Sequence, residues 1–395
     1  MRVLILAPQP FYQNRGTPIA VKLLAEVLGR RGMKVHLLVF HEGEDVVLEN
    51  VTIHRIPAIP GISRIPPGFS GKKLVADLFL WMTSFKLQRA IRFDLVHAVE
   101  ESVFIARCNR FFFRVPYVYD MDSCLSDQLV AKLTPLKPLR WLFEWFENGA
   151  IRGSVGVVAV CKALEQKIRQ LDPEKPLVRL EDISLLQECS APAREESLRQ
   201  SLGINGRIVL YVGNLERYQG IDLLLHGFAS LARHNADSVL VIIGGSQDDI
   251  ARYRGMAAQL ALADRIFFTG PRPVDALGSY LRQADILISP RTEGENTPMK
   301  IYSYMDSGRP VLATHIASHT QVLDETNAVL FEPVPERLAE SLADLLEDKE
   351  RGRLLAQRAK EKIAAEFSRP VFEQKLLDFY RTLEHRLADQ RQRLR

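Results

Sequence analysis

Four side chains suited to binding and catalysis lie close together between Arg291 and Lys300, in the segment RTEGENTPMK. The two basic residues enclose two carboxylates, Glu293 and Glu295, which Gly294 separates. Guanidinium and ammonium groups suit a diphosphate, and carboxylates accept hydrogen bonds from sugar hydroxyl groups. The segment therefore fits a site for a nucleoside diphosphate sugar. A capped surface helix with solvated charges is the alternative interpretation.

The flanking sequence predicts the elements that would position these groups. Asp285 to Ser289 is a short apolar run typical of a buried parallel strand, and Pro290 ends it. After a loop and a helix, Gly308 suits the left-handed residue that closes a helix, and Pro310 prevents its continuation. The order is strand, loop, helix, strand.

The start of this helix is expected to bind an anion. Asn296 or Thr297 can serve as the N-cap, and Pro298 suits the first helical position. The unpaired amides of Met299 and Lys300 would then face a phosphate, with the solvent-facing Lys300 ammonium beside them.

Length and composition limit the class of protein. The 395 residues are 47% hydrophobic and 25% charged, and this length exceeds one hydrophobic core, so two domains are expected. The net charge of +4 is too small to indicate nucleic acid as a partner. Apolar runs of about 18 residues are missing, so a membrane-spanning helix is not expected. The opening MRVLILAPQP predicts a strand and lacks a signal-peptide pattern.

The cysteines favour a cytoplasmic location. The four of them are scattered along the chain, which argues against a zinc site and a disulfide framework and fits a reducing compartment. They are Cys108, Cys124, Cys161 and Cys189.

Two successive series of strands and helices predict an α/β protein with two Rossmann-like, doubly wound domains. We place the first domain at residues 1–185, a polar linker at 186–205 and the second domain at 206–365. A C-terminal helix over 366–395 has an apolar face that is expected to pack on the first domain. Ligands in such sheets bind beyond the carboxyl ends of the strands.

The first loop and one basic segment leave alternatives open. Gly16 stands without the further glycines of a dinucleotide fingerprint, so it either lets backbone approach a ligand or makes a turn. Residues 59–92 combine aromatic and basic side chains, and residues 110–114, RFFFR, do the same. Such segments lie at anionic membrane surfaces, or they form core-facing helices with a solvated basic side. We favour membrane contact.

Two stretches, YVGNLERYQGIDLLLHGF and TEGENTPMKIYSYMDSGRPVLAT, resemble family 4 of the retaining GT-B glycosyltransferases. The resemblance extends over nearly the whole chain. It implies two Rossmann-like domains that face a cleft, a C-terminal helix that crosses back to the first domain, and sugar transfer without a metal or other cofactor.

The resemblance also assigns roles to residues of the second domain. The family pattern E-x7-E becomes E-x7-S here, with Glu295 on the sugar side and Ser303 as a neutral partner for the ribose. Glu293 is the alternative sugar-side carboxylate. Where the family carries an arginine and a lysine between Gly213 and Gly220, this chain has Asn214 and Gln219.

The cation for the donor diphosphate must therefore come from another residue. Arg217, Arg291 and Lys300 are the candidates, and Lys300 is the best placed of them. Thr269 and Gly270 complete the expected donor contacts.

In the first domain, Asp122 matches a family histidine that contacts the donor sugar, and its alternative role is an N-cap. His97 is expected to be structural, although it lies at a strand end, and Glu100 or Glu101 can face the acceptor. Asp122 also belongs to a D-x-D pattern that binds metals in other glycosyltransferases, which we interpret as a coincidence.

The sequence thus predicts transfer of a hexose from a nucleoside diphosphate sugar, with uridine as the expected base, to an acceptor with retention. The acceptor would be a lipid-linked sugar or a polysaccharide near Gly16, Glu100 and Asp122, at the inner face of the membrane. Two alternatives remain: a GT-B-like binding or regulatory subunit without activity, and a nucleotide-sugar epimerase.

Overall fold

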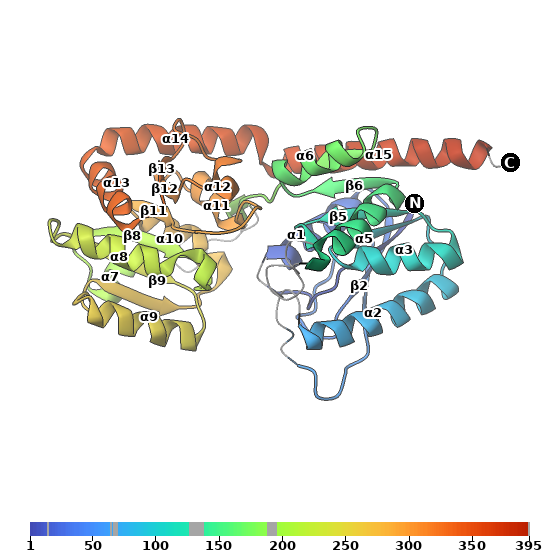
Figure 1. The fold of residues 1–395 in the computed structure, drawn as a ribbon, viewed down its shortest axis with the longest axis horizontal. Coiled ribbons are helices and arrows are strands. Elements are labelled where there is room, and N and C mark those ends of the chain that lie inside the picture. Colours follow the sequence, from blue (N-terminus) through green and yellow to red (C-terminus); the bar gives the residue numbers. More distant parts are fainter. Residues whose placement is uncertain (14–15, 64, 66–69, 126–137, 188–195, 394–395) are drawn as a thin grey trace. The chain divides into compact units, whose positions relative to one another are not determined.

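The computed structural model describes residues 1–13, 16–63, 65, 70–125, 138–187 and 196–393. They form two compact units. The first contains Met1–Glu181 and Glu373–Arg395, and the second contains Asp182–Phe372. Each unit holds one parallel sheet, which confirms the predicted α/β class with two Rossmann-like domains (Figure 1).

The sheet of the first unit has seven strands in the order β3-β2-β1-β4-β5-β6-β7. Its central strands are short apolar runs that are buried on both faces, as parallel strands between two helical layers must be. The strands are β1 (Arg2–Leu6), β2 (Lys34–Val39), β3 (Val51–Arg55), β4 (Leu95–Val99), β5 (Tyr117–Met121), β6 (Gly156–Ala159) and β7 (Leu177–Arg179).

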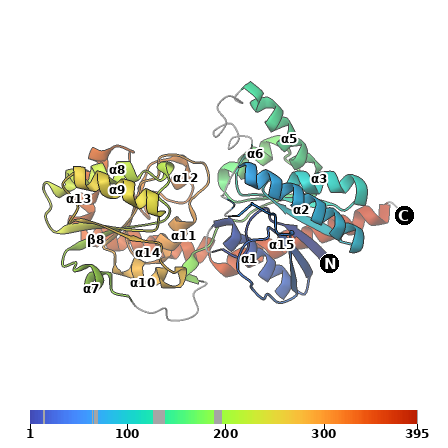
Figure 2. The same cartoon turned by 90° about the horizontal axis from the view of Figure 1, so that it is seen from below.

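Helices cover both faces of this sheet. One face carries α2 (Gly71–Ala90), α3 (Ser102–Phe113), α5 (Arg140–Gly153) and α6 (Lys162–Leu171), whose buried residues share one core with the strands. The other face carries α1 (Gly16–Arg30) and α15 (Arg369–Arg393), and Figure 2 shows α1 and α15 on the side opposite to α2 and α3.

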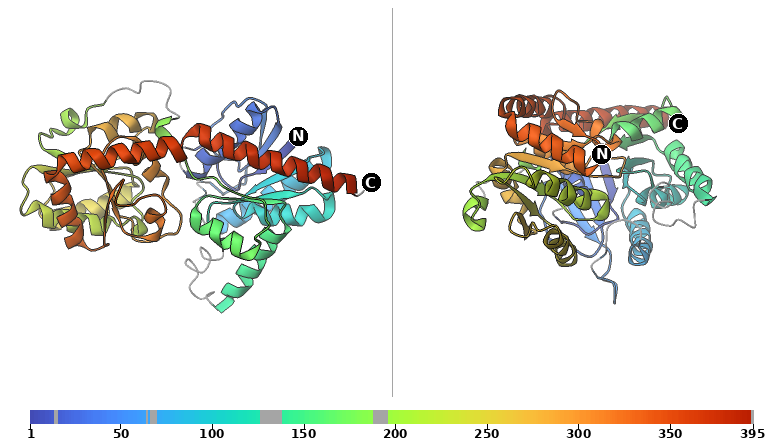
Figure 3. Two further views of the ribbon diagram at one scale, coloured as in Figure 1. Left: turned by 90° about the horizontal axis from the view of Figure 1, so that it is seen from above. Right: turned by 60° about the vertical axis from the view of Figure 1, so that its left-hand side comes forward.

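The C-terminal helix is part of the first core from Glu373 onward. Figure 3 shows α15, in red, lying along this unit. The ring of Phe379 lies so close to Gly156 that a Cβ there would approach it to 2.8 Å. The Arg31 guanidinium pairs with the Glu384 carboxylate at 3.1 Å. The apolar face that the sequence shows in this helix is therefore buried against the first sheet.

The sheet of the second unit has six strands in the order β10-β9-β8-β11-β12-β13. The predicted strand at 285–289 is confirmed as β11, one residue shorter at its start. The strands are β8 (Arg207–Val212), β9 (Ser238–Ile243), β10 (Ile266–Gly270), β11 (Ile286–Ser289), β12 (Val311–Thr314) and β13 (Val329–Phe331).

Two apolar clusters pack on opposite faces of this sheet. In Figure 2, α8 and α9 lie on one side and α10 and α14 on the other. The helices are α7 (Leu198–Leu202), α8 (Ile221–Ala232), α9 (Gln247–Gln259), α10 (Leu277–Gln283), α11 (Met299–Asp306), α12 (Ala317–Thr320), α13 (Pro335–Glu347) and α14 (Lys349–Glu366), with short 3-10 turns at Leu185–Gln187, Arg217–Gln219 and Val274–Ala276. Among the described helices, none combines the length and apolarity needed to cross a bilayer.

Candidate functional site

The loop between β11 and α11 carries the predicted anion site, but its cap differs from the prediction. The helix begins at Met299, and Pro298 is the N-cap with an extended ψ of 133°. The first bond of the turn runs from the Ile301 amide to the Pro298 carbonyl at 2.9 Å, so the amides of Met299 and Lys300 precede it. The expected helix start at Pro298 is wrong by one residue.

Neither expected side chain caps the helix. The Asn296 amide oxygen lies 3.4 Å from the Arg291 guanidinium, which draws this side chain back into the loop. The Thr297 hydroxyl is buried and, within the described part of the chain, has no hydrogen-bond partner. The N-cap prediction for these two residues is therefore wrong, because a contact with Arg291 determines the loop. At the other end, Gly308 has a φ of 72°, which confirms the predicted left-handed closing residue.

Arg291 shapes the loop from inside. Its side chain is buried and donates to the carbonyls of Glu293 at 2.5 Å and Asn296 at 3.1 Å, while its guanidinium lies 5.3 Å from the centroid of the Tyr218 ring. Burial lowers the pKa of Arg291. Gly294 has a φ of 121°, and a Cβ there would lie 2.0 Å from the guanidinium. Glycine is thus required for the loop to close around Arg291.

Lys300 is turned inward, so the expectation of a solvent-facing ammonium is wrong. Its Nζ lies 2.8 Å from the Tyr211 hydroxyl oxygen and 2.9 Å from the Gln219 Oε1, and 4.0 Å from the centroid of the Tyr211 ring. Burial, followed by the positive charge of Arg291, holds the pKa of Lys300 well below its usual value. The surroundings of Lys300 therefore disfavour its charged form.

Three loops interlock at the carboxyl ends of the strands in the second unit. Gly213, with a φ of 152°, follows β8, and its carbonyl oxygen would lie 2.1 Å from a Cβ at Gly244 after β9. A Cβ at Gly220 would lie 2.0 Å from the Pro290 carbonyl oxygen after β11. The Gly244 amide also donates to the Gly270 carbonyl at 2.9 Å, which brings Thr269-Gly270 to the same edge.

Two residues of the loop after β8 face solvent, in contrast to the inward-turned Arg291 and Lys300. Asn214 and Arg217 are exposed, and the Asn214 carbonyl accepts a hydrogen bond from the Tyr211 hydroxyl at 2.6 Å. Gln219 is buried and accepts from Lys300. Gln219 stands where the family carries a lysine. It is therefore in direct contact with Lys300, the cation that we expect to take over the role of that lysine.

Both candidate carboxylates are exposed, and backbone contacts hold both residues. The Glu293 carbonyl accepts from Arg291, and the Glu295 carbonyl accepts from the Gln321 side chain at 2.6 Å. The backbone of Glu293 is thus held on one side of Gly294 and that of Glu295 on the other. The geometry gives neither glutamate a clear advantage.

Ser303 is less accessible than the ribose role requires. It is 1% exposed, and its Oγ accepts a hydrogen bond from the Leu185 amide at 3.1 Å. Its oxygen therefore already has a partner within the second unit. A serine that replaces a glutamate here fills a structural position, because it binds the chain segment that precedes the second sheet.

The residues that hold the backbone of Arg291 were not predicted from the sequence. His319 is buried, and its two ring nitrogens lie 3.0 Å from the Ser289 hydroxyl and 2.9 Å from the Thr314 carbonyl. The Thr314 hydroxyl in turn donates to the Arg291 carbonyl. Burial lowers the pKa of His319 to about 4, so the ring is neutral. A histidine in the sequence THIASHT gives no signal for this contact.

In the first unit, Asp122 lies half-buried beyond the carboxyl end of β5. Its neighbour Asp120 pairs with His97 at 3.0 Å, and the other nitrogen of His97 lies 2.8 Å from the Tyr380 hydroxyl. His97 is thus structural, as expected. Among the described residues no cluster suited to a metal ion occurs. Gly16 is the first residue of α1, and a Cβ there would meet nothing within 4 Å, so no contact in the described chain requires glycine.

The carboxyl end of β4 carries a buried charge cluster. Glu100 adopts a φ of 51°, and Lys73 pairs with Glu101 and, at 3.7 Å, with Glu100. Burial, then the charge of Glu101, raises the pKa of Asp77 to about 8 and that of Glu100 to about 7. Burial lowers the pKa of Lys73, but the negative charges of these same acids outweigh that effect and raise it. The prediction that Glu100 or Glu101 faces an acceptor stays a prediction.

Comparison with known proteins identifies two matching family models. Residues 15–180 match the glycosyl transferase 4-like domain, and residues 194–362 match the glycosyl transferases of group 1. The chain is 25% identical over 360 residues to a D-inositol 3-phosphate glycosyltransferase from Corynebacterium glutamicum, which covers 85% of this chain and 84% of that one.

Two solved structures share the fold. A sucrose-phosphate synthase from Thermosynechococcus elongatus superposes with a TM-score of 0.79 at 21% identity, covering 97% of this chain and 99% of the other. The Anabaena protein HepE in complex with UDP-glucose superposes with a TM-score of 0.70 at 17% identity, covering 97% and 100%.

Proposed function

Because the chain belongs to the family 4 glycosyltransferases of the GT-B fold, we propose that it transfers a hexose from a UDP-sugar to an acceptor with retention of configuration. One of the similar folds was solved with UDP-glucose, which supports a uridine donor. The relative from Corynebacterium is a glycosyltransferase as well.

One observation carries the donor proposal: Arg291, which is buried, and Lys300, which is half-buried, lie together without an anion. Among the described residues, no carboxylate lies within ion-pair distance of Arg291 or Lys300, and the positive charge of Arg291 makes the charged form of Lys300 less favourable still. Buried charges are normally paired or bound to a ligand, because an isolated charge loses its hydration. A diphosphate at this strand edge would supply the missing negative charge.

The roles of the remaining residues follow from this placement. The amides of Met299 and Lys300 and the Lys300 ammonium would stabilise the departing diphosphate, so no metal ion is needed. Glu295 or Glu293 would accept hydrogen bonds from the sugar hydroxyls, and Asp122 of the first unit would stabilise positive charge that develops on the anomeric carbon.

The surface of the first unit supports an acceptor at the membrane. Helix α2 places Ala76 and Leu80 in the core, and it also exposes Leu78 (49%) and Met82 (47%), so an apolar side of this core-facing helix remains open to solvent. Residues 64 and 66–69 of the predicted segment lie outside the described residues. Exposed apolar side chains, together called the apolar face below, occur on three helices of this unit and include Leu74, Leu78, Trp81 and Met82 of α2, Phe111 and Phe112 of α3, and Trp141 and Trp145 of α5.

Basic residues accompany this apolar face. Lys72 and Arg89 lie on α2 and Arg107 on α3, which suits the interface of an anionic bilayer. We therefore propose peripheral contact with the inner face of the membrane and a lipid-linked or polysaccharide acceptor. The Leu78→Gln/Met82→Gln protein should sediment less with phosphatidylglycerol vesicles, whereas Leu354→Gln, at an exposed leucine of α14, should behave like wild type.

The test of the function is sugar transfer with a panel of UDP-sugars and acceptors in the presence of a chelator. Activity that survives chelation and falls in Glu295→Gln or Glu293→Gln supports the proposal, and the larger loss identifies the sugar-side carboxylate. Activity that the chelator abolishes contradicts metal independence. UDP binding without transfer would favour the inactive binding subunit, and donor turnover without acceptor would favour an epimerase.

A further inference from the structure

A cleft of the first unit lies at the edge opposite to Asp122. Its volume is about 990 Å³, and its wall contains the residues that immediately precede β4, β5, β6 and β7. Asp122 follows the carboxyl end of β5, so the whole length of the sheet separates this cleft from the proposed reaction edge. A ligand in the cleft would therefore not be the donor or the sugar that reacts.

The cleft is strongly basic. Six of its lining residues are cations, namely Arg92, Arg110, Arg114, Arg152, Lys175 and Arg386, against Asp94, Asp172 and Glu174. The Asp94 carboxylate accepts from the Arg2 amide at 2.8 Å, and Lys175 pairs with Asp172 at 3.1 Å. Two of the three acids thus already have partners.

Five guanidinium groups remain without counter-charge. Arg92, Arg110, Arg114, Arg152 and Arg386 are exposed, and within the described chain no carboxylate lies within ion-pair distance of them. They come from four different segments: the end of α2, the end of α3, α5 and α15. Arg114 is the C-cap of α3, where its φ of 56° ends the helix at the edge of the cleft.

Helix dipoles explain only part of this arrangement. A cation near a helix C-terminus is stabilised by the carbonyl groups there, which accounts for Arg114 and Arg152 singly. It does not account for Arg386, which lies on α15 well before the helix ends at Arg393 and joins the same cleft. Convergence of unpaired arginines from separate elements is the arrangement that binds phosphate groups, because each guanidinium can donate two parallel hydrogen bonds.

We propose that this cleft binds a phosphate-bearing molecule at a site separate from the donor site. A volume near 990 Å³ is at the upper end of small-molecule sites, so it accommodates more than an inorganic ion. A soluble phosphorylated metabolite and a phospholipid headgroup share this chemistry. The exposed Phe111 and Phe112 lie just before Arg114, which places the cleft beside the apolar face.

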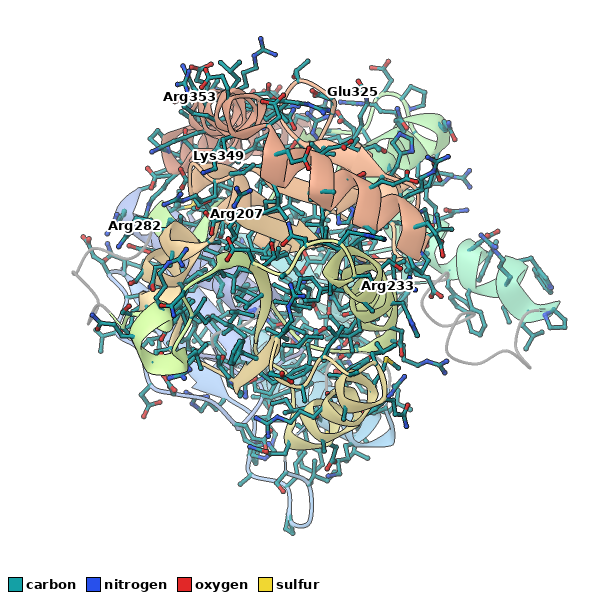
Figure 4. All side chains as sticks on the ribbon, turned by 90° about the vertical axis from the view of Figure 1, so that its left-hand side faces the viewer. Arg207, Arg233, Arg282, Glu325, Lys349 and Arg353 are labelled. Carbon is teal, nitrogen blue, oxygen red and sulfur yellow. The ribbon has the colours of Figure 1, made fainter. Side chains whose placement is uncertain are left out.

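The test compares two matched pairs of substitutions. Arg114→Gln/Arg152→Gln removes two cations of the cleft, each at a helix C-terminus. Arg233→Gln/Arg282→Gln removes two cations at the C-terminal ends of α8 and α10 in the second unit, where Figure 4 shows both arginines. The control pair has the same change in net charge and the same helix-end positions. Calorimetric titration with inorganic pyrophosphate at low salt, and co-sedimentation with phosphatidylglycerol and phosphatidylcholine vesicles, are the two measurements.

We expect the cleft pair to lose about tenfold or more in affinity and the control pair to bind like wild type. Loss of pyrophosphate binding identifies a soluble phosphate ligand, and loss confined to phosphatidylglycerol vesicles identifies a lipid headgroup. The Lys300→Met protein, whose donor site is changed, should keep the pyrophosphate binding that depends on the cleft. If the cleft pair equals the control pair in both measurements, or if Lys300→Met abolishes all pyrophosphate binding, the inference is wrong.

Discussion

The Lys300 ammonium lies over the Tyr211 ring, 4.0 Å from its centroid, and the same nitrogen lies 2.8 Å from the hydroxyl oxygen of that tyrosine. Burial raises the pKa of Tyr211 well above its usual value, so the hydroxyl is neutral and gives Lys300 no formal counter-charge. The ring face and the hydroxyl oxygen hold the cation in place before a ligand arrives. An anion that binds beside Lys300 therefore meets an ammonium group that lost its hydration when the protein folded.

The Lys300→Met substitution should therefore separate binding from stability. Methionine has a similar length and removes a buried charge, so the free energy of unfolding should change by less than about 1 kcal/mol or rise. UDP affinity should fall about tenfold or more, since a charge-assisted contact contributes about 1.5–3 kcal/mol. Calorimetry with UDP and urea unfolding check both parts, with Lys360→Met on the exposed side of α14 as control. Wild-type affinity for UDP would contradict the assignment.

UDP binding should depend on pH through Lys300. Its pKa is low in the free protein, so the ammonium loses its proton as the pH rises through that value, and UDP affinity should fall over the same range. A bound diphosphate stabilises the charged form and raises the pKa, so binding should take up protons. Titrations in two buffers of different ionisation enthalpy measure this uptake. Equal uptake in wild type and Lys300→Met would show that another group is responsible.

Gly294→Ala should weaken UDP binding, because it adds a steric clash to the backbone strain in the loop between β11 and α11. The φ of 121° disfavours alanine, and the added Cβ would approach the Arg291 guanidinium to 2.0 Å. Gly308→Ala is the matched control, because its φ of 72° is also left-handed but a Cβ there meets nothing within 4 Å. Both variants should lose about 1–2 kcal/mol of stability. Only Gly294→Ala should lose UDP binding, as measured by calorimetry.

The carboxylates near Lys73 should make the stability of the first unit depend on pH. The pKa of Asp77 is raised to about 8, chiefly by burial, so the folded state favours its protonated form. The resulting stabilisation is complete below the unfolded pKa near 4 and is lost as the pH rises through about 8. Asp77→Asn, which mimics the protonated group, should flatten the decline in unfolding free energy between about pH 4 and pH 8. A decline equal to that of wild type and of Glu340→Gln would contradict this origin.

The fold was predictable because burial leaves a local signal in the chain. Val209 to Tyr211 and Ile286 to Ser289 are apolar runs that become strands, and Gly308 marks a helix end through its own backbone. Each of these signals is complete within a few residues. The same holds for Met299 and Lys300 at the start of α11, which were placed to within one position.

The details of the site could not be predicted, because distant contacts determine them. Asn296 fails to cap α11 since Arg291 draws it away, and Lys300 turns inward since Tyr211 and Gln219 receive it. Ser303 is occupied by the Leu185 amide, 118 residues away in the chain. None of these partners follows from spacing or residue type.

The first unit is built from two separate stretches of the chain, and this fixes the order in which the two units can fold during synthesis. Its core needs residues from Glu373 onward, and the ribosome makes these after the whole of Asp182–Phe372. The second unit, which is one continuous segment, can complete its core while the first still lacks the Tyr380 hydroxyl for His97 and the Phe379 ring beside Gly156. The half of the chain that is translated first is thus the half that finishes folding last.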